Sequence, residues 1–312
     1  MYATDHSLYF VIIFYISIYS LIRPTKKYLR INTISSTSLE NAPNLSEMIL
    51  DDNELSNFGI ASGAFDRLRQ LRRISLIRNK LTEFPTNLPS SINALYLTQN
   101  QISYVSPESL HDLINLEILY LDRNKLHDGS FVISGFESLV NLRELELSYN
   151  IITHVPGRIS FTLERLHITA NQLQYLRRTE LDGLYNLRVL YMAYNRLRSI
   201  EHGTLEGLKN LERVDLSGNN WSCDCYLKDL KQYLWTKGVH HGAREQVTCS
   251  DALHSNDLLD TIQESQLVCP ELRFNVTESN LKIKIQSDPV GEQPPFAQYR
   301  LLYRELDGMF IT

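Results

Sequence analysis

Apolar and polar positions follow one recurring order along most of the chain. The order is Leu-x-x-Leu-x-Leu-x-x-Asn-x-Leu, with other apolar residues replacing Leu in places, and it begins eight times between Leu45 and Leu211. The alternating apolar positions predict a short strand, and the asparagine follows where the chain must turn. Because one such unit cannot bury its own apolar face, we expect the eight units to stack around a continuous core.

The asparagines set the period of this repeat. They are spaced 26, 21, 24, 26, 21, 24 and 24 residues apart. Since stacked strands keep a fixed separation, the extra residues of longer repeats must lie on the opposite side. Apolar spacing predicts helical turns there at 63–71, 108–116, 134–142, 179–187 and 203–211. We assign the eight asparagines a structural role as repeat anchors: Asn53, Asn79, Asn100, Asn124, Asn150, Asn171, Asn195 and Asn219.

Eight copies of an eleven-position pattern resemble the leucine-rich repeat family. The cycle of repeat lengths is similar to two of its branches, the fibronectin leucine-rich transmembrane proteins and the small leucine-rich proteoglycans. The text "NKLTEFPTNLPSSINALYLTQN", residues 79–100, looks most like the first branch. The resemblance implies an α/β fold class, with the repeats at 45–219 forming a right-handed, curved solenoid whose parallel sheet lines the concave face. It also implies that each anchor asparagine is buried and bonds backbone groups of adjacent turns.

The N-terminal region differs from the repeats. Residues 1–22 contain "LYFVIIFYISIYSLI", an apolar stretch from Leu8 to Ile22 whose length suits a signal peptide better than a full membrane span. Positive charges follow this stretch instead of preceding it, so a signal anchor is the alternative. We expect residues 23–44 to form an irregular N-terminal cap over the first repeat.

Four cysteines lie together late in the chain, at positions 223, 225, 249 and 269. An even, clustered set predicts local disulfides and an oxidising compartment, and a zinc site is the alternative. The stretch resembles the cysteine-bearing C-terminal cap of extracellular leucine-rich repeat proteins, here residues 220–270. That resemblance implies the pairs Cys223–Cys249 and Cys225–Cys269. Leu227, Leu230 and Leu234 have helical spacing and are expected to cover the last repeat.

Residues 271–312 alternate in polarity and resemble the first strands of a fibronectin type III module. The family has Trp near Ile285, which this chain lacks. A complete module is about twice this length, so we expect a membrane anchor, if there is one, to lie beyond residue 312. Three triplets fit the glycosylation pattern, at Asn44, Asn220 and Asn275.

Composition narrows the functional classes. The formal net charge is -5 and no basic block is present, so we expect no nucleic-acid partner. The sequence has no Gly-rich phosphate loop, nucleophile elbow or His-Glu metal motif. A shallow sheet also offers no enclosed pocket. We therefore expect a protein that is not an enzyme, with no catalytic residues, no metal, no cofactor and no small-molecule substrate.

Side chains between the buried strand positions should line the concave face. Tyr and Arg are enriched at binding hot spots, although Tyr also favours strands for its own packing. We predict a partner-binding face that includes Tyr96, Tyr120, Arg123, Glu144, Glu146, Tyr149, His167, Tyr191 and Tyr194.

The sequence thus favours a cell-surface adhesion receptor ectodomain that binds a protein through its concave face. The resemblance implies latrophilin-type adhesion receptors and netrin receptors as partners of the repeats, and fibroblast growth factor receptors as partners of the fibronectin part. One alternative is a secreted matrix protein of the small proteoglycan type that binds collagen. Another is an intracellular leucine-rich scaffold, which would require reduced cysteines.

Overall fold

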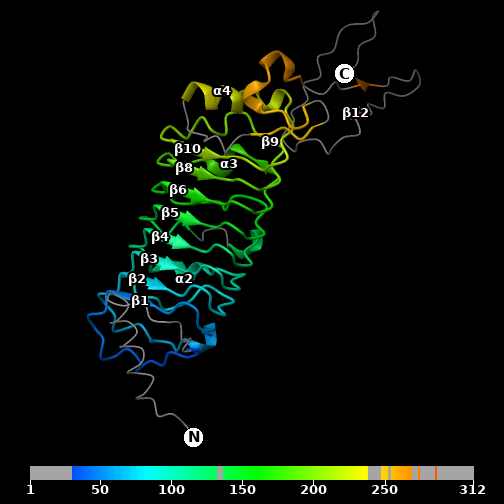
Figure 1. Ribbon diagram of the computed structural model, residues 1–312. Coiled ribbons are helices and arrows are strands. Elements are labelled where there is room, and N and C mark those ends of the chain that lie inside the picture. The colour runs from blue at the N-terminus through cyan, green and yellow to red at the C-terminus, as the bar shows by residue number, and fades with distance from the viewer. Residues whose placement is uncertain are drawn as a thin grey trace, which may run out of the picture.

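A computed structural model describes residues 30–131, 136–237, 247–251 and 254–268, and two strand pieces at 273–274 and 285–286. Eight three-residue strands form one parallel sheet in chain order, stacked from the N-terminal to the C-terminal end (Figure 1). The predicted stack of repeats is therefore confirmed. The strands are β1 Glu47–Ile49, β2 Arg73–Ser75, β3 Ala94–Tyr96, β4 Ile118–Tyr120, β5 Glu144–Glu146, β6 Arg165–His167, β8 Val189–Tyr191 and β10 Arg213–Asp215.

The central residue of every strand points into the core. These eight side chains are paired in register between neighbouring strands and are at most 1% exposed. Each fully buried aliphatic side chain contributes about 1.5–3 kcal/mol. The residues are Met48, Ile74, Leu95, Leu119, Leu145, Leu166, Leu190 and Val214.

The anchor asparagines hold successive turns together. Asn150 is typical, because its Nδ2 donates to the carbonyl oxygens of Leu121 and Leu147 at 3.0 and 2.9 Å. Its Oδ1 accepts from the N–H of Leu126, in the preceding turn, at 2.9 Å. Six of the eight anchors are buried. The family resemblance implied this bonding, and the structure shows it.

The residue before each anchor has a left-handed backbone. Its φ lies between 53° and 62° in all eight repeats. Only Gly218 adopts this conformation without steric cost, whereas a residue with a Cβ loses about 1–2 kcal/mol. The anchor's bonds must outweigh that cost in the other seven repeats, whose residues are Asp52, Arg78, Gln99, Arg123, Tyr149, Ala170 and Tyr194.

The side opposite the sheet contains less helix than the apolar spacing predicts. Two of the five predicted segments are helical, at α2 Pro107–His111 and α3 Arg178–Leu181. The other three, as far as the structure describes them, form successive turns. Gly63 and Gly203 have φ of 76° and 75° at the start of two of them, which is incompatible with a right-handed helix. Further short elements are 3-10 helices η1 Asn57–Gly59 and η2 Asp128–Ser130, and paired strands β7 Tyr175–Leu176 and β9 Ser199–Ile200.

Residues 30–44 cover the apolar end of the first repeat without regular structure. Ile31, Ile34 and Leu39 are buried in the same core as the repeats. The N–H of Ile31 donates to Asn53 Oδ1 at 2.9 Å, the contact that a repeat makes with the next anchor. The remainder of the expected cap and the apolar segment at 1–22 lie outside the described residues.

The other end of the stack is covered by the segment that follows the last repeat. The 3-10 helix η3 Cys225–Leu227 leads into α4 Lys228–Lys237, and Leu227, Leu230 and Leu234 are buried as expected. Trp221, which replaces the last repeat Leu, is fully buried and donates its Nε1–H to the Leu216 carbonyl at 2.9 Å. Beyond α4 lie η4 Leu259–Thr261 and η5 Glu264–Gln266.

Within residues 271–312, the structure describes two short strands. β11 Arg273–Phe274 pairs antiparallel with β12 Ile285–Gln286. The rest of the fibronectin-like segment lies outside the described residues. Among the residues that the structure describes, no helix has the length and apolar character needed to cross a membrane.

Candidate functional site

The last residue of each strand points out of the core, and these residues form a column across the sheet. The strand register places the column in the order Ile49, Ser75, Tyr96, Tyr120, Glu146, His167, Tyr191 and Asp215. Five of the predicted face residues therefore lie side by side on five successive strands. Glu144, at the other end of β5, lies on the same side of the sheet. We call Tyr96, Tyr120, Glu144, Glu146, His167 and Tyr191 the central cluster.

Aromatic rings in the central cluster are held edge to face. The rings of Tyr96 and Tyr120 have centroids 5.1 Å apart, and those of His167 and Tyr191 are 5.0 Å apart. The Tyr120 hydroxyl donates to Glu144 Oε1 at 2.6 Å. Burial is the main cause that raises the pKa of the Tyr120 hydroxyl, and the bond to the Glu144 carboxylate raises it further. These contacts hold the rings of Tyr120 and His167 against neighbouring side chains of the sheet face.

The carboxylates of the central cluster are crowded and partly buried. Burial raises the pKa of Glu146 to about 7, and repulsion from Asp122 and Glu144 adds to the shift although bonds from Ser148 oppose it. His167 Nδ1 lies 3.5 Å from Glu146 Oε2. The buried Nε2 of His167 has no hydrogen-bond partner. Burial lowers the pKa of His167. Glu146 therefore titrates near neutral pH.

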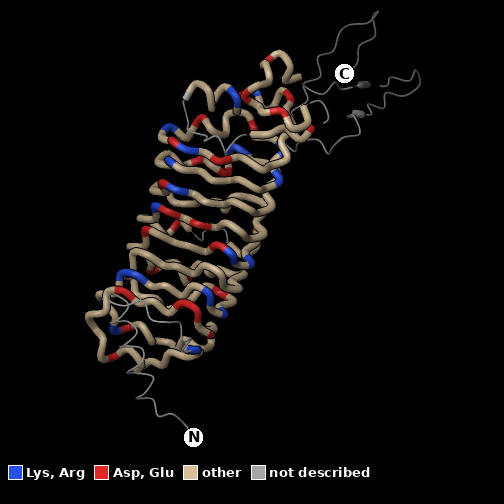
Figure 2. The backbone as a smooth tube through the Cα atoms, in the orientation of Figure 1, with Lys and Arg blue, Asp and Glu red and all other residues tan. Residues whose placement is uncertain are grey.

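Arginines surround the central cluster. Arg165 contacts Glu144 Oε2 at 3.3 Å, and Arg213 donates to the Tyr191 hydroxyl at 3.3 Å. Acidic and basic residues are interspersed along the stack (Figure 2). The face is aromatic and charged, but not strongly positive or negative.

Three of the predicted face residues lie at the edge of the sheet. Arg123, Tyr149 and Tyr194 occupy the left-handed position before an anchor, three residues after the end of a strand. The Arg123 guanidinium stacks 4.0 Å from the centre of the Tyr149 ring. Tyr149 and Tyr194 are 49% and 67% exposed, so they form an open rim beside the half-buried central cluster.

Sequence reasoning missed Asp122. It lies two positions after Tyr120 and accepts from the Thr98 hydroxyl at 2.6 Å. Burial raises its pKa. The signal that was available is its place in the repeat, since a residue two positions after the column should still lie close to the sheet.

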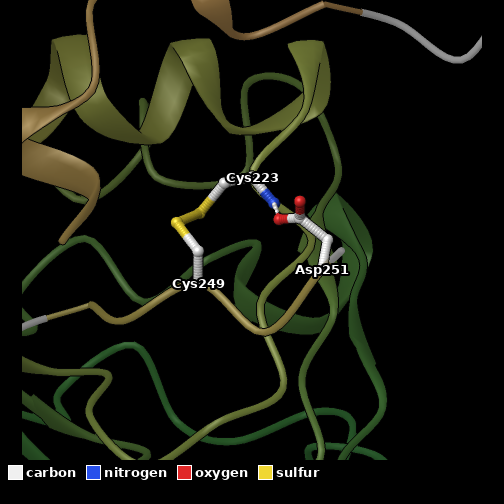
Figure 3. A group of neighbouring side chains, drawn as sticks. All are labelled: Cys223, Cys249 and Asp251. Atoms are coloured by element: carbon white, nitrogen blue, oxygen red, sulfur yellow. Dashed lines mark hydrogen bonds between the residues drawn. A yellow bond between two sulfur atoms is a disulfide. The ribbon is translucent and has the colours of Figure 1, made fainter. Parts of the chain in front are cut away.

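The cysteines of the C-terminal cap form disulfides. Cys223 and Cys249 are bonded, with their Cα atoms 5.5 Å apart (Figure 3). Asp251 is close to both, but its Oδ2 accepts from the Cys223 N–H at 2.7 Å. The disulfide uses both thiols that a zinc ion would need, so the zinc alternative is not supported here. Cys225 is also disulfide-bonded, and Cys269 lies outside the described residues.

Two of the three glycosylation triplets can be placed. Asn44, just before β1, and Asn220, just after the last anchor, are both exposed. Asn275 lies outside the described residues. Exposure makes the first two accessible, and their modification stays a prediction.

Comparisons with known proteins agree with this fold. Residues 82–126 and 161–220 match the family model described as leucine rich repeat. The leucine-rich repeat transmembrane protein FLRT2 of Rattus norvegicus is 33% identical over 205 residues, covering 65% of this chain and 31% of that protein. Lumican of Coturnix japonica is 34% identical over 197 residues, covering 62% of this chain and 57% of that protein. The chain thus covers about a third of FLRT2 and little more than half of lumican.

A solved structure extends the similarity. In an octameric complex of latrophilin 3, Unc5D and FLRT2, the leucine-rich repeat part of FLRT2 superposes with a TM-score of 0.70 and 28% identity. The match covers 77% of this chain and 74% of that chain. The repeated sequence, the stacked parallel sheet and these similarities together make the chain a leucine-rich repeat protein, related to FLRT2 and to the small leucine-rich proteoglycans.

Proposed function

We propose that the chain is an extracellular protein-binding module of a cell-surface adhesion receptor, and that it binds through the exposed face of its sheet. The central cluster supports this proposal most directly. It offers three fixed tyrosine rings, two carboxylates and a histidine, with arginines around them. Fixed aromatic residues with a charged surround are typical of protein-binding hot spots.

The compartment is supported by the disulfide of the C-terminal cap. Disulfides persist in oxidising environments and are rare in the cytosol. Cys223–Cys249 closes a loop over a sequence separation of 26 residues at the exposed end of the stack. This bond disfavours the intracellular scaffold. FLRT2 and lumican, the named relatives, fit an extracellular setting.

The FLRT2 complex suggests which partners to test first. It contains latrophilin 3 with its Olf domain and Unc5D with its Ig domains. We infer that receptors of these two types are candidate partners of the central cluster. The fibroblast growth factor receptors expected for the fibronectin-like part concern residues outside the described ones, and they remain a sequence prediction.

A matrix role is the second candidate, because lumican is as similar to this chain as FLRT2 is. In a matrix role, the chain would bind collagen instead of a cell-surface receptor. The position of the binding face would be the same, so the identity of the ligand distinguishes the two functions.

Surface plasmon resonance with the immobilised full chain separates these functions. The analytes are the latrophilin 3 Lec–Olf fragment, the Unc5D Ig–Ig2–TSP1 fragment and fibrillar collagen. We expect saturable binding of at least one receptor fragment. Binding of collagen alone would move the chain to the matrix class. Binding of none of the three would contradict the proposed partner classes.

A further inference from the structure

One flank of the stack carries exposed apolar side chains at a single position in four successive repeats. The position is four residues before the first strand residue, and it is occupied by Ile114, Val140, Phe161 and Tyr185 before β4, β5, β6 and β8. These side chains are 50%, 48%, 61% and 59% exposed. Since stacked strands lie about 4.8 Å apart, the four side chains form a row roughly 15 Å long. We call this row the flank ridge.

A second set of asparagines fixes the backbone of the flank ridge. Asn141 Nδ2 donates to the Ile114 carbonyl at 2.7 Å, and Asn186 Nδ2 donates to the Phe161 carbonyl at 3.0 Å. Asn210 does the same to the Tyr185 carbonyl at 2.8 Å. Each bond joins a ridge residue to a later repeat. Three of the four ridge residues are therefore bonded to a neighbouring repeat through their carbonyls, although the ridge lies in turns.

A row of alternating charges runs beside the flank ridge, one residue before each strand. Along the stack it reads Glu117, Arg143, Glu164, Arg188 and Glu212. Arg143 contacts Glu164 at 3.1 Å and Glu117 at 3.9 Å, and Arg188 contacts Glu212 at 3.1 Å. A groove of about 300 Å³ on this flank is lined by Arg143, Glu164 and Arg188 together with Asn141, Thr162, Asn186 and Asn210.

Both rows are complementary to themselves under the same two-fold rotation. The rotation axis lies in the plane of the flank, runs across the stack, and passes midway between β5 and β6. It places β5 opposite β6 of a second copy, and β4 opposite β8. Apolar residues then meet apolar ones, because Val140 faces Phe161 of the partner subunit and Ile114 faces Tyr185 of the partner subunit.

The charge row obeys the same rotation. Arg143 then faces Glu164 of the partner subunit, and Glu117 faces Arg188 of the partner subunit. An axis shifted by half a repeat, onto β5 or β6, would bring like charges together. An axis shifted by a full repeat would leave a ridge residue opposite Ser90 or Lys209. Only the midway axis matches all four ridge residues and both charge pairs. Such matching is the requirement of an isologous two-fold interface.

We propose that this flank is a homodimer interface, with the flank ridges of two antiparallel stacks in contact and the charge rows setting their register. A standard interface covers about 800 Å² of each partner, which four half-exposed side chains do not reach. The dimer is therefore weak and depends on concentration. It leaves the sheet face of both copies open, so it does not rest on the proposed function.

Sedimentation velocity of the full chain across micromolar concentrations tests the dimer. We expect a monomer–dimer equilibrium in the micromolar range. Phe161→Ser should raise the dissociation constant at least tenfold. Ile151→Ser is the control. Ile151 is an aliphatic residue that is 48% exposed, but it lies after its strand, next to the anchor Asn150, and not before the strand as the ridge residues do. This variant should leave the dissociation constant unchanged.

Charge reversal tests the register. Arg143→Glu alone should prevent dimerisation, since two carboxylates would then face each other across the interface at each contact with Glu164 of the partner subunit. Glu164→Arg alone should prevent it for the converse reason, because two guanidinium groups would meet. An equal mixture of the two variants should dimerise again, because every facing pair is then of opposite charge. Loss of stability within one chain cannot produce this rescue. A wild type that stays monomeric, equal effects of Phe161→Ser and Ile151→Ser, or a mixture that stays monomeric would each overturn the proposal.

Discussion

Replacing Asn150 with Ala removes a side chain that joins two neighbouring turns of the stack. Its Nδ2 donates to the carbonyls of Leu121, Leu147 and Ser148 at 3.0, 2.9 and 3.3 Å. Its Oδ1 accepts from the Leu126 N–H at 2.9 Å. The residue is 7% exposed, so water cannot readily replace these bonds. The substitution therefore leaves the Leu126 N–H without a partner. The three carbonyls each keep one other donor, from the Asn124 side chain, the Asn171 side chain and the Arg123 N–H.

The size of the effect follows from the groups that lose their bonds. Leaving the buried Leu126 N–H unpaired costs about 1–3 kcal/mol, and each of the three carbonyls loses one bond worth about 0.5–1.5 kcal/mol. We expect a loss of about 3 kcal/mol, near the lower end of the sum, because each carbonyl keeps its other donor. For a chain of this size, about 2–4 °C of Tm corresponds to each kcal/mol, so the Tm should fall by roughly 6–12 °C.

Thermal unfolding followed by circular dichroism measures this fall, with Asn141→Ala as the matched control. Asn141 is exposed and makes one bond across the flank, from Nδ2 to the Ile114 carbonyl. Its loss should cost less than about 1 kcal/mol. If Asn150→Ala and Asn141→Ala lowered the Tm equally, the anchors would not be what holds the turns together.

Three further predictions concern the central cluster, the cap and the turns. Burial raises the Glu146 pKa from 4.5 to about 7, so the folded state binds the proton more tightly and stability is lost as pH rises through this window. Glu146→Gln should therefore increase the free energy of unfolding above pH 7 by up to about 3 kcal/mol, with a higher Tm, and should change it little near pH 4. A Tm difference that does not depend on pH would contradict this. Replacing Cys223 and Cys249 together with Ser should cost about 3–4 kcal/mol in denaturant unfolding, and an unchanged midpoint would show that the cap does not depend on the bond. Gly218→Ala should destabilise by about 1–2 kcal/mol, because φ there is 62° and a Cβ would meet a Tyr ring at 2.7 Å, whereas Gly207→Ala has open space and should be neutral. Equal Tm values for the two Gly variants would refute the strain.

The repeated part of the fold could be predicted in detail from the sequence. The spacing of apolar residues and asparagines determines which side chains are buried and which strand residues are neighbours. The sequence alone places Tyr120 and Glu146 side by side, although they are 26 residues apart in the chain. This works because every repeat solves the same packing problem with the same residues.

Features that depend on backbone strain were not visible in the sequence. The left-handed residue before each anchor is Asp, Arg, Gln, Tyr or Ala as readily as Gly, so its identity carries no signal. Conversely, the apolar spacing at 63–71 and 203–211 suggests a helix, but the positive φ of Gly63 and Gly203 is incompatible with a right-handed helix at those positions. Apolar spacing reports which residues are buried and does not decide how the backbone between them turns.

The candidate site was predicted as a surface but not as an arrangement of charges. The raised pKa of Glu146 depends on burial and on Asp122, which belongs to the neighbouring repeat. Contacts of this kind arise from side-chain packing between turns, and no local pattern in the sequence encodes them. The flank ridge was overlooked for a different reason, since its residues read simply as apolar positions of a turn.

The affinity of a double variant, Tyr120→Ala with Tyr191→Ala, tests most directly whether the sheet face is the binding surface. Both rings are half-buried in the central cluster, whereas Tyr104, which is 41% exposed and lies away from the strands of the sheet, provides the control variant Tyr104→Ala. In surface plasmon resonance with the receptor fragment or collagen that binds the wild type, the double variant should bind roughly 700-fold more weakly, since two hot-spot residues contribute about 2 kcal/mol each. Circular dichroism at the assay temperature should show that the double variant remains folded. An affinity equal to that of Tyr104→Ala would place the binding surface elsewhere on the protein.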